Sequence, residues 1–171
     1  MKQSITVIPE KITYDQAFTL VQSVSAHLSP QIQKKVFYPY YWVHFEYEVK
    51  TILGMRKIQA YTLVDMLENQ ASTADRFEPV VTEAEEENIL TPIIDPGQAL
   101  KTARTYLVHS AIHTMKALLY PRSTVIREVH LHKPFWIVRC DNRQGERFRV
   151  IVDGLTGKFQ ILEPISKIGY F

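Results

Sequence analysis

The sequence predicts an α+β protein made of two units, each a helix followed by a short antiparallel sheet. Three observations predict it: two segments of helical spacing with marked starts, an aromatic strand beginning with proline after each of them, and two hairpins that end alike. The 171 residues are 46% hydrophobic and 22% charged, which is typical of a globular chain rather than a disordered or fibrous one.

The first helix is expected to begin at Thr13, whose hydroxyl forms a capping-box pattern with Gln16 three residues later. The helix should stop before Pro30, because proline disfavours the α conformation in the residue ahead of it. Apolar residues recur between these points at helical spacing: Ala17, Leu20, Val21, Val24 and Leu28.

The first aromatic strand begins at Pro39 and is expected to bury one face. Tyr41, Val43 and Phe45 share that face, since they alternate with polar positions such as His44. The rest of the sheet is expected to be a hairpin through Gly54, a return strand ending Leu63-Val64-Asp65, and a weaker strand from Ala71 to Asp75.

An acidic stretch follows the first sheet. From Asp65 to Asp95 there are nine acidic residues against the single base Arg76. Such a charge run is typical of a solvated linker or an exposed helical turn. We therefore predict a first unit at 1–77, an acidic linker at 78–94 and a second unit at 95–171.

The second helix has a clear start, with Asp95 as N-cap, Pro96 at the first helical position and Gln98 completing the cap. Helical spacing continues for about two dozen residues, up to a proline at position 121. Val108 and Ile112 widen its apolar arc beyond what one sheet would cover. We expect this long helix to pack on the sheet and to be buried on more than one side, between the units or in a dimer.

The second aromatic strand begins at Pro134 and can be laid over the first. Trp136, Val138 and Cys140 then take the inward positions. The other expected elements are an extra strand at Val125 to Leu131, a hairpin through Asn142 to Gly145, a return strand ending Ile151-Val152-Asp153, and a last strand at Phe159 to Leu162. Asn69 and Gly157 fall at equivalent turn positions, where a positive φ is expected. The alternative is a single α+β sheet whose two hairpins look alike because hairpins do.

The residues from Val150 to Lys158, reading Val-Ile-Val-Asp-Gly-Leu-Thr-Gly-Lys after a helix and an aromatic strand, resemble the ending of a PepSY-type domain. The resemblance covers Asp95 to Leu162 and, more faintly, Thr13 to Asp75. It implies a PepSY- or cystatin-like helix on a short antiparallel sheet and a non-catalytic, inhibitory or protein-contacting role. No catalytic residues come with it.

The turn in that motif has a structural interpretation. Asp153 and Thr156 have short polar side chains that can cap backbone groups of a hairpin, and Gly157 permits the tight conformation. We expect these three residues to hold the turn rather than to bind a ligand.

Two surfaces are candidates for contact with a partner. Tyr40, Trp42 and His44 lie on the second face of the first aromatic strand, and Val108 and Ile112 widen the apolar arc of the long helix. Exposed aromatic residues are favoured in protein interfaces. We expect a protein partner or self-association there, unless the rest of the chain covers these residues.

A basic stretch offers a second kind of surface. The segment from Pro121 to Arg149 contains seven basic and three acidic residues. Aromatic residues are interleaved with the basic ones, as on a surface that binds single-stranded nucleic acid. The candidate residues are Arg139, Arg143, Arg147 and Arg149. The alternative function is therefore a nucleic-acid-associated accessory protein, with the acidic linker masking the basic sheet.

Four histidines form the weakest candidate site. His109 and His113 are four residues apart on the long helix, and His130 and His132 share a face of a strand. Together they could bind a transition metal, but the spacing matches no zinc motif. The sequence therefore predicts no metal centre, and a His-rich metal-binding protein is the minor alternative.

Catalytic patterns and targeting segments are absent from the sequence. There is no nucleophile elbow and no glycine-rich phosphate loop. No apolar run reaches the ~20 residues of a membrane helix, no signal-peptide pattern opens the chain, and a single cysteine, Cys140, fits a reducing compartment. We predict a cytoplasmic, non-enzymatic protein without a cofactor, which binds another protein or itself through its sheet faces and long helix.

Overall fold

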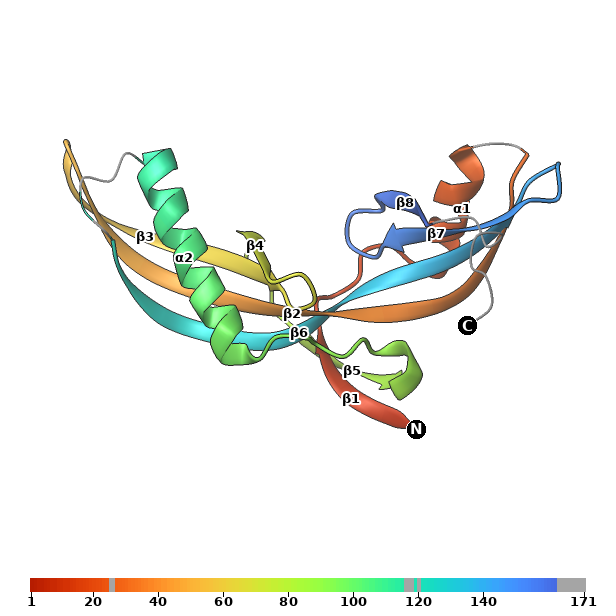
Figure 1. The fold of residues 1–171 in the computed structure, drawn as a ribbon, viewed down its shortest axis with the longest axis horizontal. Coiled ribbons are helices and arrows are strands. Elements are labelled where there is room, and N and C mark those ends of the chain that lie inside the picture. The colour runs from red at the N-terminus through yellow and green to blue at the C-terminus, as the bar shows by residue number, and fades with distance from the viewer. Residues whose placement is uncertain (25–26, 116–118, 120, 163–171) are drawn as a thin grey trace. The chain divides into compact units, whose positions relative to one another are not determined.

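The protein has an α+β fold with two α-helices and a mixed sheet of eight strands among the residues described by the computed structural model, which are 1–24, 27–115, 119 and 121–162 (Figure 1). In chain order the elements are β1 (Lys2–Val7), α1 (Tyr14–Val24), β2 (Ser29–Thr51), β3 (Gly54–Asp65), β4 (Gln70–Thr73), β5 (Val80–Glu85), the 3-10 helix η1 (Glu86–Asn88), α2 (Pro96–Met115), β6 (Arg122–Asp141), β7 (Arg147–Asp153) and β8 (Phe159–Leu162). The predicted fold class is confirmed at this level.

The strands pair in the order β4-β3-β2-β6-β1-β5, with β7 on β6 and β8 on β7. The β1–β6 pairing is parallel, whereas β2–β3, β3–β4, β1–β5, β6–β7 and β7–β8 are antiparallel. The two long strands, β2 and β6, each contribute residues to both compact units of the chain. Unit 1 comprises Met1–Tyr38, Pro79–Leu90 and His132–Phe171, and unit 2 comprises Pro39–Glu78 and Thr91–Leu131.

These units differ from the predicted sequential division at 1–77 and 95–171. Helix α1 packs on the hairpin of β6 and β7, and helix α2 packs on the hairpin of β2 and β3. Each helix therefore covers the hairpin from the other half of the sequence. The reason is the length of β2 and β6, because each strand begins in the unit of its preceding helix and ends in the other unit.

The predicted acidic linker at 78–94 is corrected by the structure. Val80–Glu85 forms β5, which pairs along its whole length with β1, from Lys2↔Glu85 to Val7↔Val80. Ala84 is buried with Ile5 and Val7. Charged residues protect the edge of a sheet from further pairing, so an acidic edge strand looks like a solvated linker in the sequence.

The core of unit 2 is formed by one face of α2 and the inward face of β2 and β3. An apolar stripe of three alanines and one leucine packs on a cluster that includes Tyr41, Val43, Phe45 and Val64; the stripe consists of Ala99, Ala103, Leu107 and Ala111. The opposite side of the helix is more open, since Ile112 is 37% exposed. Burial of α2 on several sides is therefore not seen within the described chain, and a dimer stays a prediction.

The core of unit 1 is built the same way. Ala17 and Val21 of α1 pack on an inward face that includes Trp136, Val138 and Cys140 of β6. The indole Nε1 of Trp136 donates to the Ile12 carbonyl oxygen at 2.9 Å, so its one polar group is satisfied. The predicted inward orientation of Trp136 is confirmed.

Both predicted helix starts are confirmed by their hydrogen bonds. The Gln16 amide donates to Thr13 Oγ1 at 3.4 Å, and the Thr13 amide donates to Gln16 Oε1 at 2.9 Å. Asp95 Oδ1 accepts the amide of Gln98 at 2.9 Å. These bonds satisfy amides that the first helical turn leaves without a partner.

The two hairpins also share one register. Tyr41 pairs with Val64, and Trp136 pairs with Val152. At their ends, the Met66 amide donates to the Pro39 carbonyl and the Gly154 amide donates to the Pro134 carbonyl. The turns contain the predicted positive φ values, 55° at Asn69 and 70° at Gly157. The superposition of the two aromatic strands made from the sequence therefore agrees with the observed pairing.

Candidate functional site

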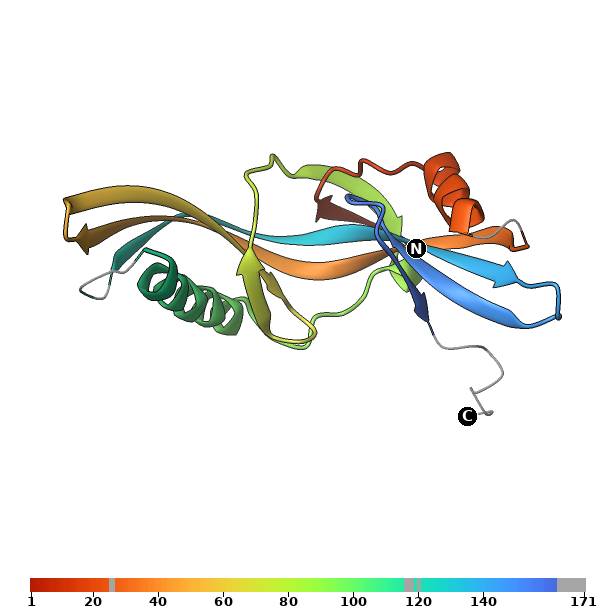
Figure 2. The ribbon, with the colours of Figure 1, turned by 90° about the horizontal axis from the view of Figure 1, so that it is seen from above.

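One concave site lies in unit 2, beside α2 and the edge strand β4, whose ribbons can be followed in Figures 1 and 2. It is a groove of about 730 Å³. Its lining residues are Asn69, Ala71, Gln98, Lys101, Thr102, Thr105, Tyr106, His109, Ser110 and Thr114. The groove thus joins a turn, a strand edge and a helix face within one unit.

Strand β4 presents backbone groups to this groove. It is the terminal strand in the sheet order and pairs with β3 from Thr62↔Thr73 to Asp65↔Gln70. The Thr73 amide points away from β3, because it donates to Tyr106 Oη at 3.1 Å. Amides two residues apart on a strand point to the same side. The Ala71 amide therefore also faces outward, toward the groove.

Tyr106 and Asn69 tie the helix to the two ends of β4. Tyr106 Oη is 2.8 Å from Thr73 Oγ1 in addition to its bond from the Thr73 amide. At the other end Thr102 Oγ1 donates to Asn69 Oδ1 at 2.7 Å. The groove wall between these two contacts is therefore held in a defined geometry by side-chain hydrogen bonds.

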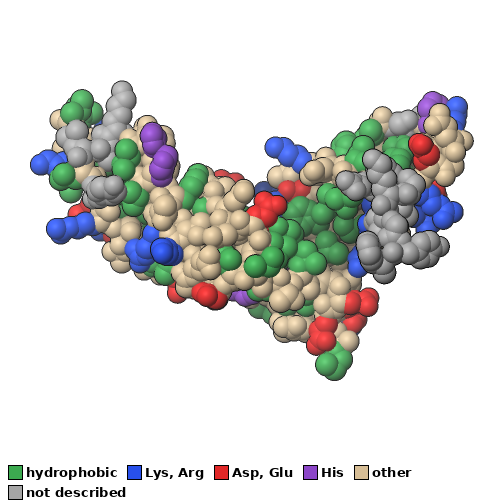
Figure 3. All heavy atoms as spheres, in the orientation of Figure 1, with side chains coloured by type: hydrophobic (Ala, Val, Ile, Leu, Met, Phe, Trp, Pro, Cys, Tyr) green, Lys and Arg blue, Asp and Glu red, His purple; other side chains and the backbone are tan. Residues whose placement is uncertain are grey.

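The groove carries a cationic side chain, that of Lys101, on its helix side. Lys101 and His109 are its ionisable lining residues apart from Tyr106, and no carboxylate is among the side chains that line it. The His109 ring lies against the His113 ring, with centroids 4.3 Å apart. Figure 3 shows histidine side chains side by side on the surface over α2. Such a lining is complementary to a ligand that carries a carboxylate.

The groove residues Thr102, Thr105 and Tyr106 were missed by the sequence analysis. A signal for them exists, since a polar stripe that includes 98, 102, 105 and 109 follows the helical period beside the buried alanine stripe. What the sequence does not reveal is that this stripe faces the edge of a sheet rather than open solvent.

Trp42, a predicted contact residue, is not exposed. It is 2% accessible, and its ring stacks on Tyr61 at 5.6 Å and lies 5.2 Å from Phe77. Its Nε1 donates to the Asp75 carbonyl at 3.4 Å. The segment after β4 returns over this sheet face, so Trp42 is covered from within its own unit and cannot anchor a partner. This outcome corrects the interpretation of Trp42 as an exposed anchor.

The other predicted contact residues are partly accessible. Tyr40 and His44 are half-buried on the same sheet face as Trp42, and His44 stacks on Tyr61 with centroids 4.5 Å apart. Val108 is half-buried on α2, and Ile112 is exposed. The structure brings His44 into an aromatic cluster rather than into an open surface.

The four candidate metal ligands do not form one cluster. His109 and His113 are adjacent on α2, whereas His132 is buried in unit 1, with Nδ1 3.3 Å from the Thr6 carbonyl oxygen. Burial lowers the pKa of His130. Among the residues that the structure describes, no group of three or more histidine, cysteine, aspartate or glutamate side chains could hold a metal ion.

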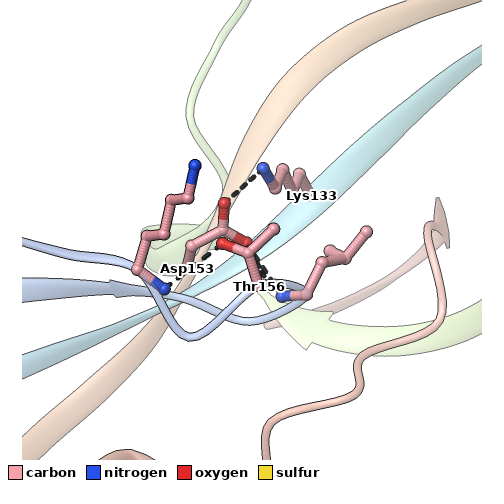
Figure 4. A network of polar contacts seen from close by, with 5 residues as sticks. Lys133, Asp153 and Thr156 are labelled. Carbon is pink, nitrogen blue, oxygen red and sulfur yellow. Dashed lines mark hydrogen bonds and ion pairs between the residues drawn. The ribbon is translucent and has the colours of Figure 1, made fainter.

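The Asp153 turn has the structural role that the sequence predicts (Figure 4). Asp153 Oδ1 accepts the amides of Leu155 at 2.8 Å and Thr156 at 3.2 Å, and Thr156 Oγ1 accepts the amide of Lys158 at 3.2 Å. The other Asp153 oxygen, Oδ2, forms an ion pair with Lys133 Nζ at 2.6 Å.

These contacts set the pKa of Asp153. Burial alone would raise the pKa, but the Lys133 ammonium and the two turn amides stabilise the carboxylate more strongly. The net result is a pKa below the ordinary aspartate value. Asp153 is therefore a charged, stabilising part of the turn.

The four candidate arginines lie at the β6–β7 hairpin of unit 1. Arg139 and Arg149 are half-buried and directly opposite each other, Arg147 pairs with Asp141 at 3.3 Å, and Arg143 is exposed in the connecting turn. The structure therefore brings all four to one hairpin, but only two of them face each other.

Cys140, the single cysteine, is fully buried. Burial, with a smaller contribution from Asp141, raises the pKa of its thiol. A buried thiol with a raised pKa is a poor nucleophile. Its position in the core agrees with the structural interpretation made from the sequence.

Comparisons with protein-family models, with curated proteins and with solved structures found no match to this chain. No helix in the described part of the chain is long and apolar enough to cross a membrane.

Proposed function

We propose that this chain is a non-enzymatic protein-binding module, and that the α2–β4 groove holds an extended segment of a partner protein. The observation that carries the proposal is the edge strand beside the helix, with a groove of about 730 Å³ between them. Addition of a peptide strand to an exposed sheet edge is a recurring mode of peptide recognition, in which backbone bonds give affinity and side-chain pockets give specificity.

The proposed strand addition is short and has a defined limit. By strand alternation the Ala71 amide and carbonyl face outward, where they can pair with an incoming backbone. Tyr106 already accepts the Thr73 amide and so marks one end of the pairing. Because β4 has only four residues, side chains of α2 must supply the rest of the affinity.

Charge defines the chemistry of the partner segment. Lys101 and His109 line the groove without a neighbouring carboxylate among the lining residues. The proposed segment therefore carries an acidic side chain or a C-terminal carboxylate on the helix side. By contrast, the edge strand β5 carries Glu83 and Glu85, a charge pattern that discourages further strand pairing.

We further propose that both units are diverged members of the PepSY-like type, arranged in tandem. The shared register of the two hairpins and the equivalent turns at Asp65 and Asp153 support this proposal. The family resemblance in turn supports a protein-contacting rather than catalytic role. A second copy of the chain is the alternative occupant of the groove, and it is an outcome of the test below.

The test is selection of linear peptides from a random display library on the purified full chain. Wild type is compared with Thr105→Glu, which places a longer, negatively charged side chain into the groove from an exposed helix position. The matched control is Thr124→Glu, which makes the same change on an exposed position of the same unit outside the groove.

The proposal expects peptides with a common acidic pattern on wild type and on Thr124→Glu, and none on Thr105→Glu. Enrichment that is equal on all three proteins would contradict it, as would the absence of any enriched pattern on wild type. Concentration-dependent dimerisation lost only in Thr105→Glu would assign the groove to a second copy of the chain instead.

A further inference from the structure

The outward face of the β6–β7 hairpin in unit 1 contains two arginines in an unusual position. Arg139 and Arg149 are register partners, so their side chains leave directly opposite positions on one face. Both are half-buried. Like charges directly opposite each other destabilise a sheet, so an anion between them would be favourable.

The donors of these two arginines are not all satisfied. The Nε atoms of both Arg139 and Arg149 are buried without a hydrogen-bond partner. Arg139 Nη2 donates to Gln31 Oε1, which is a neutral acceptor. A buried donor without a partner is costly, and such groups are rare in folded proteins unless a water or ion completes them.

The acidic groups of the hairpin contact other side chains. Asp141, two residues along the same strand face, forms an ion pair with Arg147 Nε at 3.3 Å, and its Oδ1 is buried without a hydrogen bond. Glu146 accepts a hydrogen bond from Asn142 Nδ2 in the turn at 2.8 Å. No ion pair joins Arg139 or Arg149 to a carboxylate in the part of the chain that the structure describes.

The equivalent positions in unit 2 carry no opposed like charges on this sheet face. There the outward register partners are His44 and Tyr61, whose rings stack with centroids 4.5 Å apart. The next pair, Glu46 and Gln59, is joined by a hydrogen bond of 2.7 Å. In unit 2 the side chains on this face therefore interact with each other, whereas in unit 1 the two arginines do not.

We propose that Arg139 and Arg149 form a binding site for a phosphate group. Guanidinium groups present planar, permanently charged donors that match phosphate oxygens, often through two parallel hydrogen bonds. A phosphate between them would accept the Nε hydrogens and remove the repulsion between the two cations. The ligand is free phosphate, a small phosphoester or the phosphate backbone of a nucleic acid.

Thermal unfolding of the full chain tests the site, with inorganic phosphate against chloride at matched ionic strength. The variant is Arg139→Gln/Arg149→Gln, and the control is Arg143→Gln/Lys158→Gln, which removes the same charge from exposed positions of the same unit and leaves the arginine pair and the Arg147–Asp141 ion pair unchanged. Phosphate should raise the melting temperature of wild type and control, because a ligand that binds only the folded state stabilises it. The affinity of the Arg139/Arg149 variant should fall about tenfold or more.

The unliganded proteins give a second readout. Without phosphate, Arg139→Gln/Arg149→Gln should melt at the same temperature as wild type or higher, because it removes the repulsion and the orphaned donors. A lower melting temperature would show that the pair stabilises the fold by itself and would overturn the proposal. If phosphate raised the melting temperature of both double variants by an equally reduced amount, the proposal would also be overturned. Phosphate would then respond to the net positive charge of the protein and not to the arginine pair.

A fluorescent single-stranded oligonucleotide of about ten nucleotides distinguishes the sources of phosphate. Oligonucleotide binding that falls only in the Arg139/Arg149 variant assigns the site to nucleic-acid phosphates. A phosphate shift without oligonucleotide binding assigns it to free phosphate or a small phosphoester. No effect of either ligand on wild type would contradict the proposal.

Discussion

The hairpins of unit 1 and unit 2 have the same inner construction and different surroundings. Inward positions are filled in both, by Tyr41, Val43 and Phe45 in one and by Trp136, Val138 and Cys140 in the other. The outward pair is a stack of two rings in unit 2 and two arginines in unit 1. The features that the two hairpins share form their cores, whereas the candidate sites lie where the hairpins differ.

The turn beside each helix shows the same division. In unit 1 a Cβ added at Gly157 would lie 3.0 Å from Leu20 Cδ1 of α1, so the turn and the helix are in apolar contact. In unit 2 Asn69 contacts Thr102 of α2 through a hydrogen bond, at the end of the groove. The contact between turn and helix is therefore apolar in one unit and polar in the other.

The largest expected effect compares two equivalent core positions. Phe45→Ala should destabilise the protein by about 3–5 kcal/mol, because it leaves a large cavity in a fully buried site. Cys140→Ala, at the matching buried position, should cost about 1 kcal/mol, because it removes a single sulfur atom. Urea unfolding measures both. Equal costs would show that the two inner faces are not packed alike.

The Asp153 turn is expected to give the next largest effect. Asp153→Asn removes the ion pair with Lys133 and should cost about 1–3 kcal/mol at pH 7. The pKa of Asp153 is lower in the folded state than in the unfolded state, so its contribution is present above the unfolded value and is lost as the pH falls through the folded one. The difference between wild type and variant should therefore shrink below about pH 4. A difference that stays constant from pH 7 to pH 3 in urea unfolding would refute this assignment.

Gly157→Ala tests the apolar contact between turn and helix. It should cost about 1–2 kcal/mol for the left-handed backbone alone, at φ 70°. The crowding against Leu20 adds to this cost. Gly145→Ala is the control, since Gly145 also has a positive φ, 78°, but no atom lies within 4 Å of the added carbon. Similar unfolding free energies for the two variants would mean that the close approach to α1 does not matter.

Tyr106→Phe should have the smallest effect on stability. It removes the hydroxyl that accepts the Thr73 amide at one end of the groove, at a cost of about 0.5–1.5 kcal/mol. The same change should lengthen the edge available to a bound peptide by one amide and so should not weaken peptide binding. Unfolding by urea and peptide titration measure the two effects. Loss of peptide binding would place Tyr106 among the ligand contacts instead.

Local features of the fold could be predicted from the sequence. The caps at Thr13 and Asp95 and the turns at Asn69 and Gly157 depend on a few neighbouring residues, so they leave a readable pattern. The inward face of each aromatic strand follows from simple alternation, as Trp136 confirms.

Long-range features could not be predicted. The pairing of β1 with β5 joins residues about 80 positions apart. The packing of each helix on the hairpin from the other half of the sequence depends on the lengths of β2 and β6. The burial of Trp42 by Phe77 and the groove beside β4 follow from these arrangements. Periodicity gives the face of an element but not the neighbour that covers it.

Amide hydrogen exchange at β4, with a peptide selected on the groove, tests the proposed function most directly. The Ala71 amide faces outward, whereas the Ala74 amide already donates to the Tyr61 carbonyl at 2.8 Å. Strand addition should slow exchange at Ala71 strongly and leave Ala74 nearly unchanged. A peptide that binds tightly while the exchange rate of Ala71 stays the same would contradict the account.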